Sequence, residues 1–168
     1  MNPAHLHLLT NHFPIVGIAF GIIVLIAGLL FKKDDFKNAA YGIFILTALL
    51  AVPAYLSGEP AEEAVENLPG ITEALIETHE EIATVAIWLV ELLGVLALAV
   101  LIYTIKGKPV QRIGGVVTLL FSMAVFGVMV KVGNSGGEIR HPEVRRNQGT
   151  VLQENVNGNV TEQEKDED

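Results

Sequence analysis

The sequence predicts an all-α protein, an integral membrane four-helix bundle with both termini outside, an acidic helical outer loop and a disordered C-terminal tail. Three observations lead to this fold class. Hydrophobic residues make up 51% of the 168 residues, and charged residues make up only 18%. The apolar residues fall in four long runs that are apolar on every face, as in membrane spans. A backbone in hydrocarbon must satisfy its own hydrogen bonds, so each run is expected to be helical.

The four spans are expected at about residues 13–31, 38–56, 82–105 and 113–130, within a transmembrane domain of residues 1–143. Pro14 suits the first turn of the first span, where backbone N–H groups lack partners. Three glycines of this span, Gly17, Gly21 and Gly28, share one helix face. They predict either close packing of a neighbouring helix or the general tolerance of membrane helices for glycine.

Basic residues predict the orientation of the bundle. Lys32, Lys33 and Lys37 follow the first span, and no basic residue precedes it. Lys106, Lys108 and Arg112 lie between the third and fourth spans, whereas the second loop contains no Lys or Arg. By the positive-inside rule, the first and third loops are cytoplasmic and both termini face out. The basic residues after the fourth span oppose this orientation but carry less weight than the loops beside the first span: Lys131, Arg140, Arg145 and Arg146.

The second loop, residues 57–81, is expected to form an acidic helical cap. Pro60 suits a helix start, Pro69-Gly70 breaks that helix, and a new helix is expected near Ile71 or Thr72 that runs directly into the third span. The cap is either a simple solvated surface, a vestibule that attracts cations, or a docking surface for a basic partner. Its eight glutamates are Glu59, Glu62, Glu63, Glu66, Glu73, Glu77, Glu80 and Glu81.

The segment after the fourth span changes character. The residues 133–137, Gly-Asn-Ser-Gly-Gly, predict a flexible turn that leaves the membrane. Residues 144–168 are rich in Gln, Asn, Glu, Gly and Asp, and they contain too little apolar surface to offset the entropy of ordering. We therefore expect a disordered acidic tail there.

Composition excludes several functions. The chain has no cysteine, which removes disulfides, thiolate metal sites and thiol catalysis. A net charge of −8 argues against nucleic acid as a partner. No Ser/His/Asp order and no zinc-protease motif is present, so hydrolase chemistry has no support, and whether the protein is an enzyme stays open.

The five histidines all map to the same side of the predicted membrane. His79 shares the apolar face of its helix, and His12 lies at the mouth of the first span, so we expect these two imidazoles to face each other. Such a pair could hold haem iron axially or bind a divalent transition metal. The spacing of His5 and His7 suits an extended arm. Alternatively, His12 and His79 are interfacial residues that only form hydrogen bonds. The further candidate metal ligands or supporting groups are His5, His7, His141 and Glu80.

Glu91 is the one charged residue within the four predicted spans. A charge near the bilayer centre costs about 3 kcal/mol on insertion scales, so the side chain must face protein or water, or be protonated. Thr47 and Ser122 lie at comparable depth and are candidate hydrogen-bond partners. Glu91 is then either a proton or ion relay group or a polar link between helices.

The residues also resemble an uncharacterised family of bacterial four-helix membrane proteins, a domain of unknown function. The resemblance rests on His12-Phe13-Pro14-Ile15, on a histidine at the head of the third span, and on residues 136–141, Gly-Gly-Glu-Ile-Arg-His. The acidic string from Gly58 to Glu81 is similar to one branch of that family. Some relatives are joined to Rieske or c-type cytochrome modules, which implies an association with electron transfer.

Three functions follow as expectations. The first is a redox-associated protein of the bacterial cytoplasmic (inner) membrane that binds b-type haem or a divalent transition metal at the outer face through His12 and His79. The second is a non-enzymatic accessory or scaffold protein whose acidic outer loop docks a redox or basic partner protein. The third is a small ion or proton transporter that uses Glu91. All three place the protein in contact with the lipid bilayer, and homo-oligomerisation stays open.

Overall fold

The computed structural model describes residues 3–107 and 110–141, and this part of the chain is helical throughout apart from short connections. Its helices are α1 (Pro3–Thr10), α2 (His12–Leu30), α3 (Asp34–Leu56), α4 (Gly58–Glu63), α5 (Glu73–Ile105) and α6 (Gln111–Arg140). Four stretches are long and apolar enough to cross a membrane, namely Ala4–Leu30, Asp34–Leu56, Glu73–Ile105 and Arg112–Ile139. The predicted all-α, four-span architecture is therefore confirmed.

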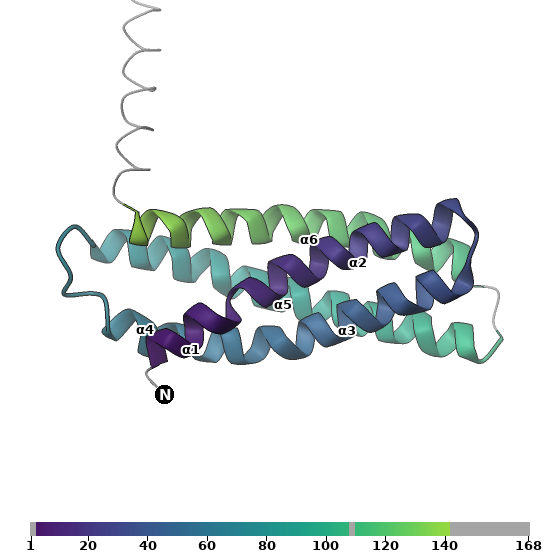
Figure 1. Ribbon diagram of the computed structural model, residues 1–168, viewed down its shortest axis with the longest axis horizontal. Coiled ribbons are helices and arrows are strands. Elements are labelled where there is room, and N and C mark those ends of the chain that lie inside the picture. The colour runs from purple at the N-terminus through teal and green to yellow at the C-terminus, as the bar shows by residue number, and fades with distance from the viewer. Residues whose placement is uncertain (1–2, 108–109, 142–168) are drawn as a thin grey trace, which may run out of the picture.

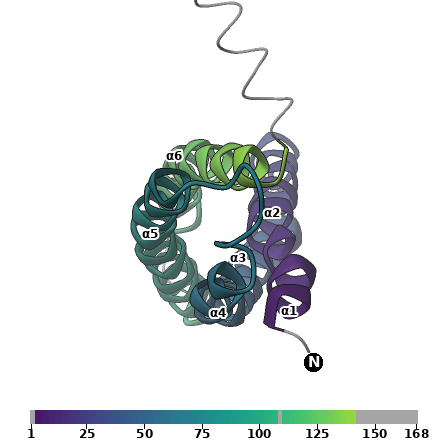
Figure 2. The same cartoon turned by 90° about the vertical axis from the view of Figure 1, so that its left-hand side faces the viewer.

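The four long helices run antiparallel to their chain neighbours and form a closed ring, in the order α2, α3, α5, α6 (Figures 1 and 2). The short helices α1 and α4 pack against each other at one end. We call this end, which carries the five histidines, the histidine end. The opposite end, with Lys32, Lys33, Lys37 and Lys106, is the lysine end.

Several helices extend beyond the predicted spans. The acidic first turn of α3 starts that helix at Asp34, which suits the positive dipole end. The helix α5 begins at Glu73 after Thr72, so the expectation of one helix running from the acidic loop into the third span is confirmed. The break at Pro69-Gly70 is confirmed as well, because Gly70 takes φ +85°, a conformation that L side chains rarely adopt.

Two predictions of local structure were wrong. The segment 133–137 does not form a flexible turn, because α6 continues through it to Arg140. Residues His5 and His7 lie in a helix, α1, and not in an extended arm. Both segments lie against neighbouring helices. In 133–137 this packing outweighs the local preference of glycine and asparagine for turns, and in α1 it outweighs the expectation from the two-residue spacing of the histidines. The predicted tail, residues 144–168, lies outside the described residues.

The predicted close-packing face of α2 is confirmed. A Cβ atom at Gly17 would collide with Thr47, one at Gly21 with the Phe44 ring, and one at Gly28 with Lys37. All three contacts are with α3, and Phe44 is only 1% exposed. Because lipid gives helices no hydrophobic reason to associate, such close approach supplies dispersion contacts that hold α2 on α3.

The lysine end of α2 is closed by a tight turn. Lys32 takes φ 53°, and the Lys33 backbone N–H donates to the Gly28 carbonyl at 3.0 Å. This arrangement satisfies a carbonyl that the helix end would otherwise leave unpaired. Lys37, one turn into α3, is buried against Gly28 and pairs with Asp34 at 2.6 Å.

We predict that Gly21→Leu destabilises the bundle, whereas Gly42→Leu does not. A leucine at position 21 must displace the buried Phe44 ring, at a cost of about 1–3 kcal/mol in unfolding free energy. Gly42 is the matched control, because a Cβ there meets nothing within 4 Å. Denaturant titration in detergent micelles measures the difference, and equal losses for the two variants would contradict the packing assignment.

Candidate functional site

The antiparallel order of four spans brings three distant segments to the histidine end: helix α1, the connection from α3 to α5, and the last turns of α6 (Figure 1). The five histidines lie on these segments or beside them, so their predicted gathering at one end of the molecule is confirmed. Only two of the five, His7 and His79, are partly buried. His5, His12 and His141 are exposed.

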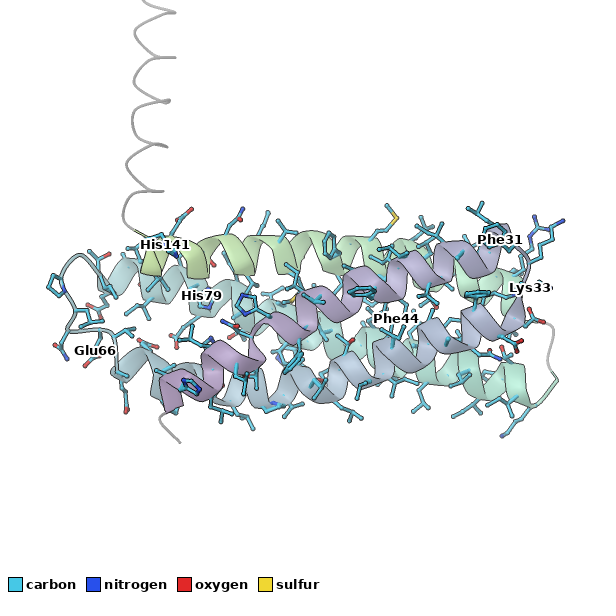
Figure 3. All side chains as sticks on the ribbon, in the orientation of Figure 1. Phe31, Lys33, Phe44, Glu66, His79 and His141 are labelled. Carbon is cyan, nitrogen blue, oxygen red and sulfur yellow. The ribbon has the colours of Figure 1, made fainter. Side chains whose placement is uncertain are left out.

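His79 lies on α5 and faces the bundle, as its position on the apolar face predicted (Figure 3). Its Nδ1 lies 2.8 Å from the Ser135 hydroxyl oxygen on α6. The Ser135 hydroxyl itself donates to the Val132 carbonyl at 3.0 Å. With that proton on the Val132 carbonyl, the Ser135 oxygen accepts from His79, and on this basis we assign the ring proton to Nδ1. The second ring nitrogen, Nε2, then has a free lone pair when the ring is neutral.

Gly136 makes room for this ring. A Cβ atom built at Gly136 would lie 3.1 Å from His79 Cε1, which is tighter than ordinary van der Waals contact. The side chain of the neighbouring Ser135 is buried in the same interface. Ser135 therefore accepts a hydrogen bond from the imidazole, and Gly136 leaves space for the ring to pack against the α6 backbone.

His7 is held in a similar way on the other side of the histidine end. Its Nδ1 lies 3.0 Å from the Ala54 carbonyl oxygen and 3.3 Å from the Ser57 hydroxyl oxygen. The Ser57 hydroxyl donates to the same Ala54 carbonyl at 3.0 Å. A carbonyl can only accept, so Nδ1 of His7 is the donor and its Nε2 lone pair is free in the neutral ring.

The rings of His7 and His79 are close enough for a charge on one to affect the other. They come from α1 and α5, and the exposed carboxylate of Glu80 also acts on His79. The partner that the sequence predicts for His79 is His12, which is exposed at the start of α2, and this pairing stays a prediction.

Sequence reasoning also left out Ser135 and Gly136 as parts of the site. The signal that could have found them is the helical spacing of inward residues that continues past the fourth predicted span, from Met129 and Val132 to Ser135 and Gly136. Within residues 3–107 and 110–141, no three His, Asp or Glu side chains gather closely enough to hold a metal ion together. A metal at this end would take its protein ligands from two imidazoles.

A pair of carboxyl groups connects the acidic loop to the site. The carboxyl of Glu62 on α4 is hydrogen-bonded to that of Glu80 on α5, beside His79. This hydrogen bond raises the pKa of Glu62 to about 7. Partial burial and repulsion from the carboxylates of Glu80, Glu66 and Glu59 act in the same direction. One proton is therefore shared between α4 and α5, which the chain 64–72 also connects.

Glu91 lies elsewhere. Its expected partners are engaged within their own helices, because Thr47 donates to the Ile43 carbonyl at 2.8 Å and Ser122 donates to the Leu119 carbonyl at 2.9 Å. Within the described part of the chain, Glu91 Oε1 is buried without a hydrogen-bond partner. The prediction that Thr47 and Ser122 bond to Glu91 was wrong, because hydroxyls in membrane helices readily bond to the preceding turn.

The four apolar spans agree with one family of proteins. Residues 3–143 match the family model described as a predicted membrane protein, DUF2231. The chain belongs to this family. The description of DUF2231 gives a membrane location and no activity, and it confirms the resemblance to an uncharacterised membrane family. No curated protein and no solved structure matches this DUF2231 protein.

We predict that α4 separates from α5 as the pH rises through about 7. The raised pKa of Glu62 means that the shared proton stabilises the contact fully below the ordinary value of 4.5, and that this contribution is lost as Glu62 ionises near pH 7. Spin labels at cysteines replacing Glu59 and Glu77 report the distance between the two helices. Glu62→Gln keeps a neutral hydrogen-bonding group, and this variant should hold the short distance at every pH. A pH-independent distance in the unsubstituted pair would contradict the assignment.

Proposed function

We propose that this DUF2231 protein binds a divalent transition-metal ion between the imidazoles of His7 and His79. The observation that supports the proposal is the hydrogen bond that each ring makes at Nδ1. Each ring donates from Nδ1 to a fixed oxygen, Ala54 O or Ser135 Oγ, and so presents Nε2 as the free donor atom. Metal-bound histidines in proteins are oriented in the same manner, with the second ring nitrogen donating to a carbonyl or similar acceptor.

The chemistry of the donor set indicates the class of ion. Imidazole nitrogens suit zinc, copper, nickel and iron, whereas magnesium and calcium prefer oxygen ligands. Two protein ligands leave further coordination positions for water or for an external ligand, a feature of metal sites that act on something. A copper or iron ion there would support the redox association that the family resemblance implies.

Haem is the second candidate occupant, because two Nε2 atoms also form the axial ligand set of b-type haem. The two occupants are separated by one measurement on the purified protein. A Soret band in the visible spectrum supports haem, and stoichiometric metal without that band supports a bare ion.

We predict that His7→Ala and His79→Ala each weaken Cu²⁺, Zn²⁺ or Ni²⁺ binding at least tenfold, whereas His5→Ala and His12→Ala leave it unchanged. The first two variants remove a ligand, and the other two remove exposed rings. Isothermal titration with each metal alone, on protein in micelles, gives the affinities. If His12→Ala weakens binding and His7→Ala does not, the pair predicted from the sequence is the correct one.

Two further variants test whether orientation matters. Ser135→Ala removes the acceptor of the His79 Nδ1–H group and should weaken metal binding about tenfold with both ligands present. Gly136→Ala should act in the same direction by displacing the ring. If the wild-type protein binds no metal, the site is overturned, and docking of a basic partner to the exposed glutamates of the acidic loop becomes the favoured function.

We also infer that the histidine end faces the outside of the bacterial cytoplasmic membrane. The support is the excess of basic residues on the loops of the lysine end, after α2 and after α5. Because the chain lacks cysteine, a single cysteine reports the side without background. Glu66→Cys should react with a membrane-impermeant maleimide in intact cells, and Lys33→Cys should react only after lysis. The reverse labelling pattern would overturn this orientation.

A further inference from the structure

The helices α1 and α2 are separated by one residue, Asn11, at which the chain bends (Figures 1 and 2). Asn11 itself keeps helical backbone angles, φ −63° and ψ −22°. Its N–H donates to the His7 carbonyl at 2.9 Å, which completes the last turn of α1. The two helices are therefore one nearly continuous helix with a bend, and no loop lies between them.

The neighbours of the chain change across this bend. In the first turn of α2, Ile15 lies beside α6, because its Cδ1 atom is 3.8 Å from a Cβ atom built at Gly133. About two turns earlier, His7 of α1 bonds instead to the Ala54 carbonyl near the end of α3. Its Cε1 atom is 3.9 Å from a Cβ atom built at Gly58 of α4. The bend therefore leads the chain from the α6 side of α3 to the α4 side.

Pro14 prevents a straight helix at this place. Proline has no N–H, so the Thr10 carbonyl, four residues earlier, cannot receive the usual helical hydrogen bond from it. The proline ring also collides with that carbonyl when the helix is straight, and sharp bends in helices nearly always lie at such positions. Pro14 is buried in the third position of α2, and the break at Asn11 falls within the turn that precedes it.

A bend of ordinary size decides whether His7 meets its partner. His7 precedes Asn11 by four residues, which is ~6 Å along the helix at ~1.5 Å per residue. Straightening by ~20°, the smallest angle of a sharp bend, would move its backbone by about 2 Å. The bond from His7 Nδ1 to the Ala54 carbonyl, 3.0 Å long, does not tolerate such a displacement.

We propose that Pro14 is a positioning residue for His7, because the bend that it causes directs α1 onto α4 and holds the imidazole on the Ala54 carbonyl with the proton on Nδ1. This gives a role to the proline of the segment His12-Phe13-Pro14-Ile15, which the metal site itself does not use. The placing of His7 is independent of a bound ion, and only its consequence for metal affinity rests on the proposed function.

The bend has two competing explanations. The Thr10 hydroxyl donates to the Leu6 carbonyl at 2.9 Å, and hydroxyl bonds of this kind also bend helices. The packing of α1 against α4 is the other. Both explanations predict that Pro14 can be replaced without effect on His7.

The test observes the imidazoles by nitrogen NMR of histidine-labelled protein in micelles, without metal. In the unsubstituted protein, neutral His7 should be a single tautomer with its proton on Nδ1. Pro14→Ala restores the N–H group, and it should release the ring into the tautomer mixture of an exposed histidine such as His5. The His79 signal is the internal control, because its partner Ser135 lies on α6 and should be unaffected.

Thr10→Val is the matched control variant, since it removes the hydroxyl and keeps Pro14, and it should leave His7 a single tautomer. If Pro14→Ala loses the native His79 signal, and has therefore not folded, Pro14→Gly restores the same N–H without a side chain and replaces it. In a titration with Ni²⁺, the Pro14 variant should bind at least tenfold more weakly than the unsubstituted protein, as His7→Ala does.

The inference is overturned if His7 stays a single tautomer in the Pro14 variant, since the packing of α1 then sets the bend. It is also overturned if Thr10→Val alone releases the ring, or if His7 is already a tautomer mixture in the unsubstituted protein. A protein that binds no Ni²⁺ but releases His7 on substitution of Pro14 would reject the proposed function and support this inference.

Discussion

The structure depends on the requirement that a backbone inside hydrocarbon satisfies all of its own hydrogen bonds. Helices meet this requirement segment by segment, so each apolar run of the chain becomes one helix that is long enough to cross the membrane. Four crossings are an even number, and they return the chain to the end at which it started. Helix α1, the acidic loop and the last turns of α6 are therefore gathered at one end before any side chain contributes to a site there.

Close packing then replaces the hydrophobic effect as the force between the helices. Lipid tails are as apolar as leucine, so helices gain from association only where their surfaces approach more closely than lipid can. Gly17, Gly21 and Gly28 give α2 this approach to α3. Gly136 of α6 allows a similar close approach by a polar side chain, because the His79 ring fills the space where a Gly136 side chain would lie.

Several polar groups in this bundle are satisfied in one of two ways. The hydroxyls of Thr47 and Ser122 donate to carbonyls of their own helices, so they need no hydrogen-bond acceptor on a neighbouring helix. The imidazoles of His7 and His79 instead bond to oxygens on other helices, which fixes the directions of their rings. Glu91 follows neither pattern, and neither do Tyr41 and Thr118, because each buries an oxygen without a hydrogen-bond partner among the described residues.

The sequence by itself determined the fold class, the four crossings, the inward face of His79 and the packing face of α2, because all of these follow from helical periodicity within one segment. Tertiary structure decided which oxygens the rings of His7 and His79 bond to, since this depends on how neighbouring helices lie against each other, and periodicity within one segment does not encode it. It also decided that residues 133–137 stay helical and that Thr47 and Ser122 bond within their own helices rather than to Glu91. Those outcomes depend on contacts between helices, which outweigh local preference when each backbone group and each buried ring must find a partner within the bundle.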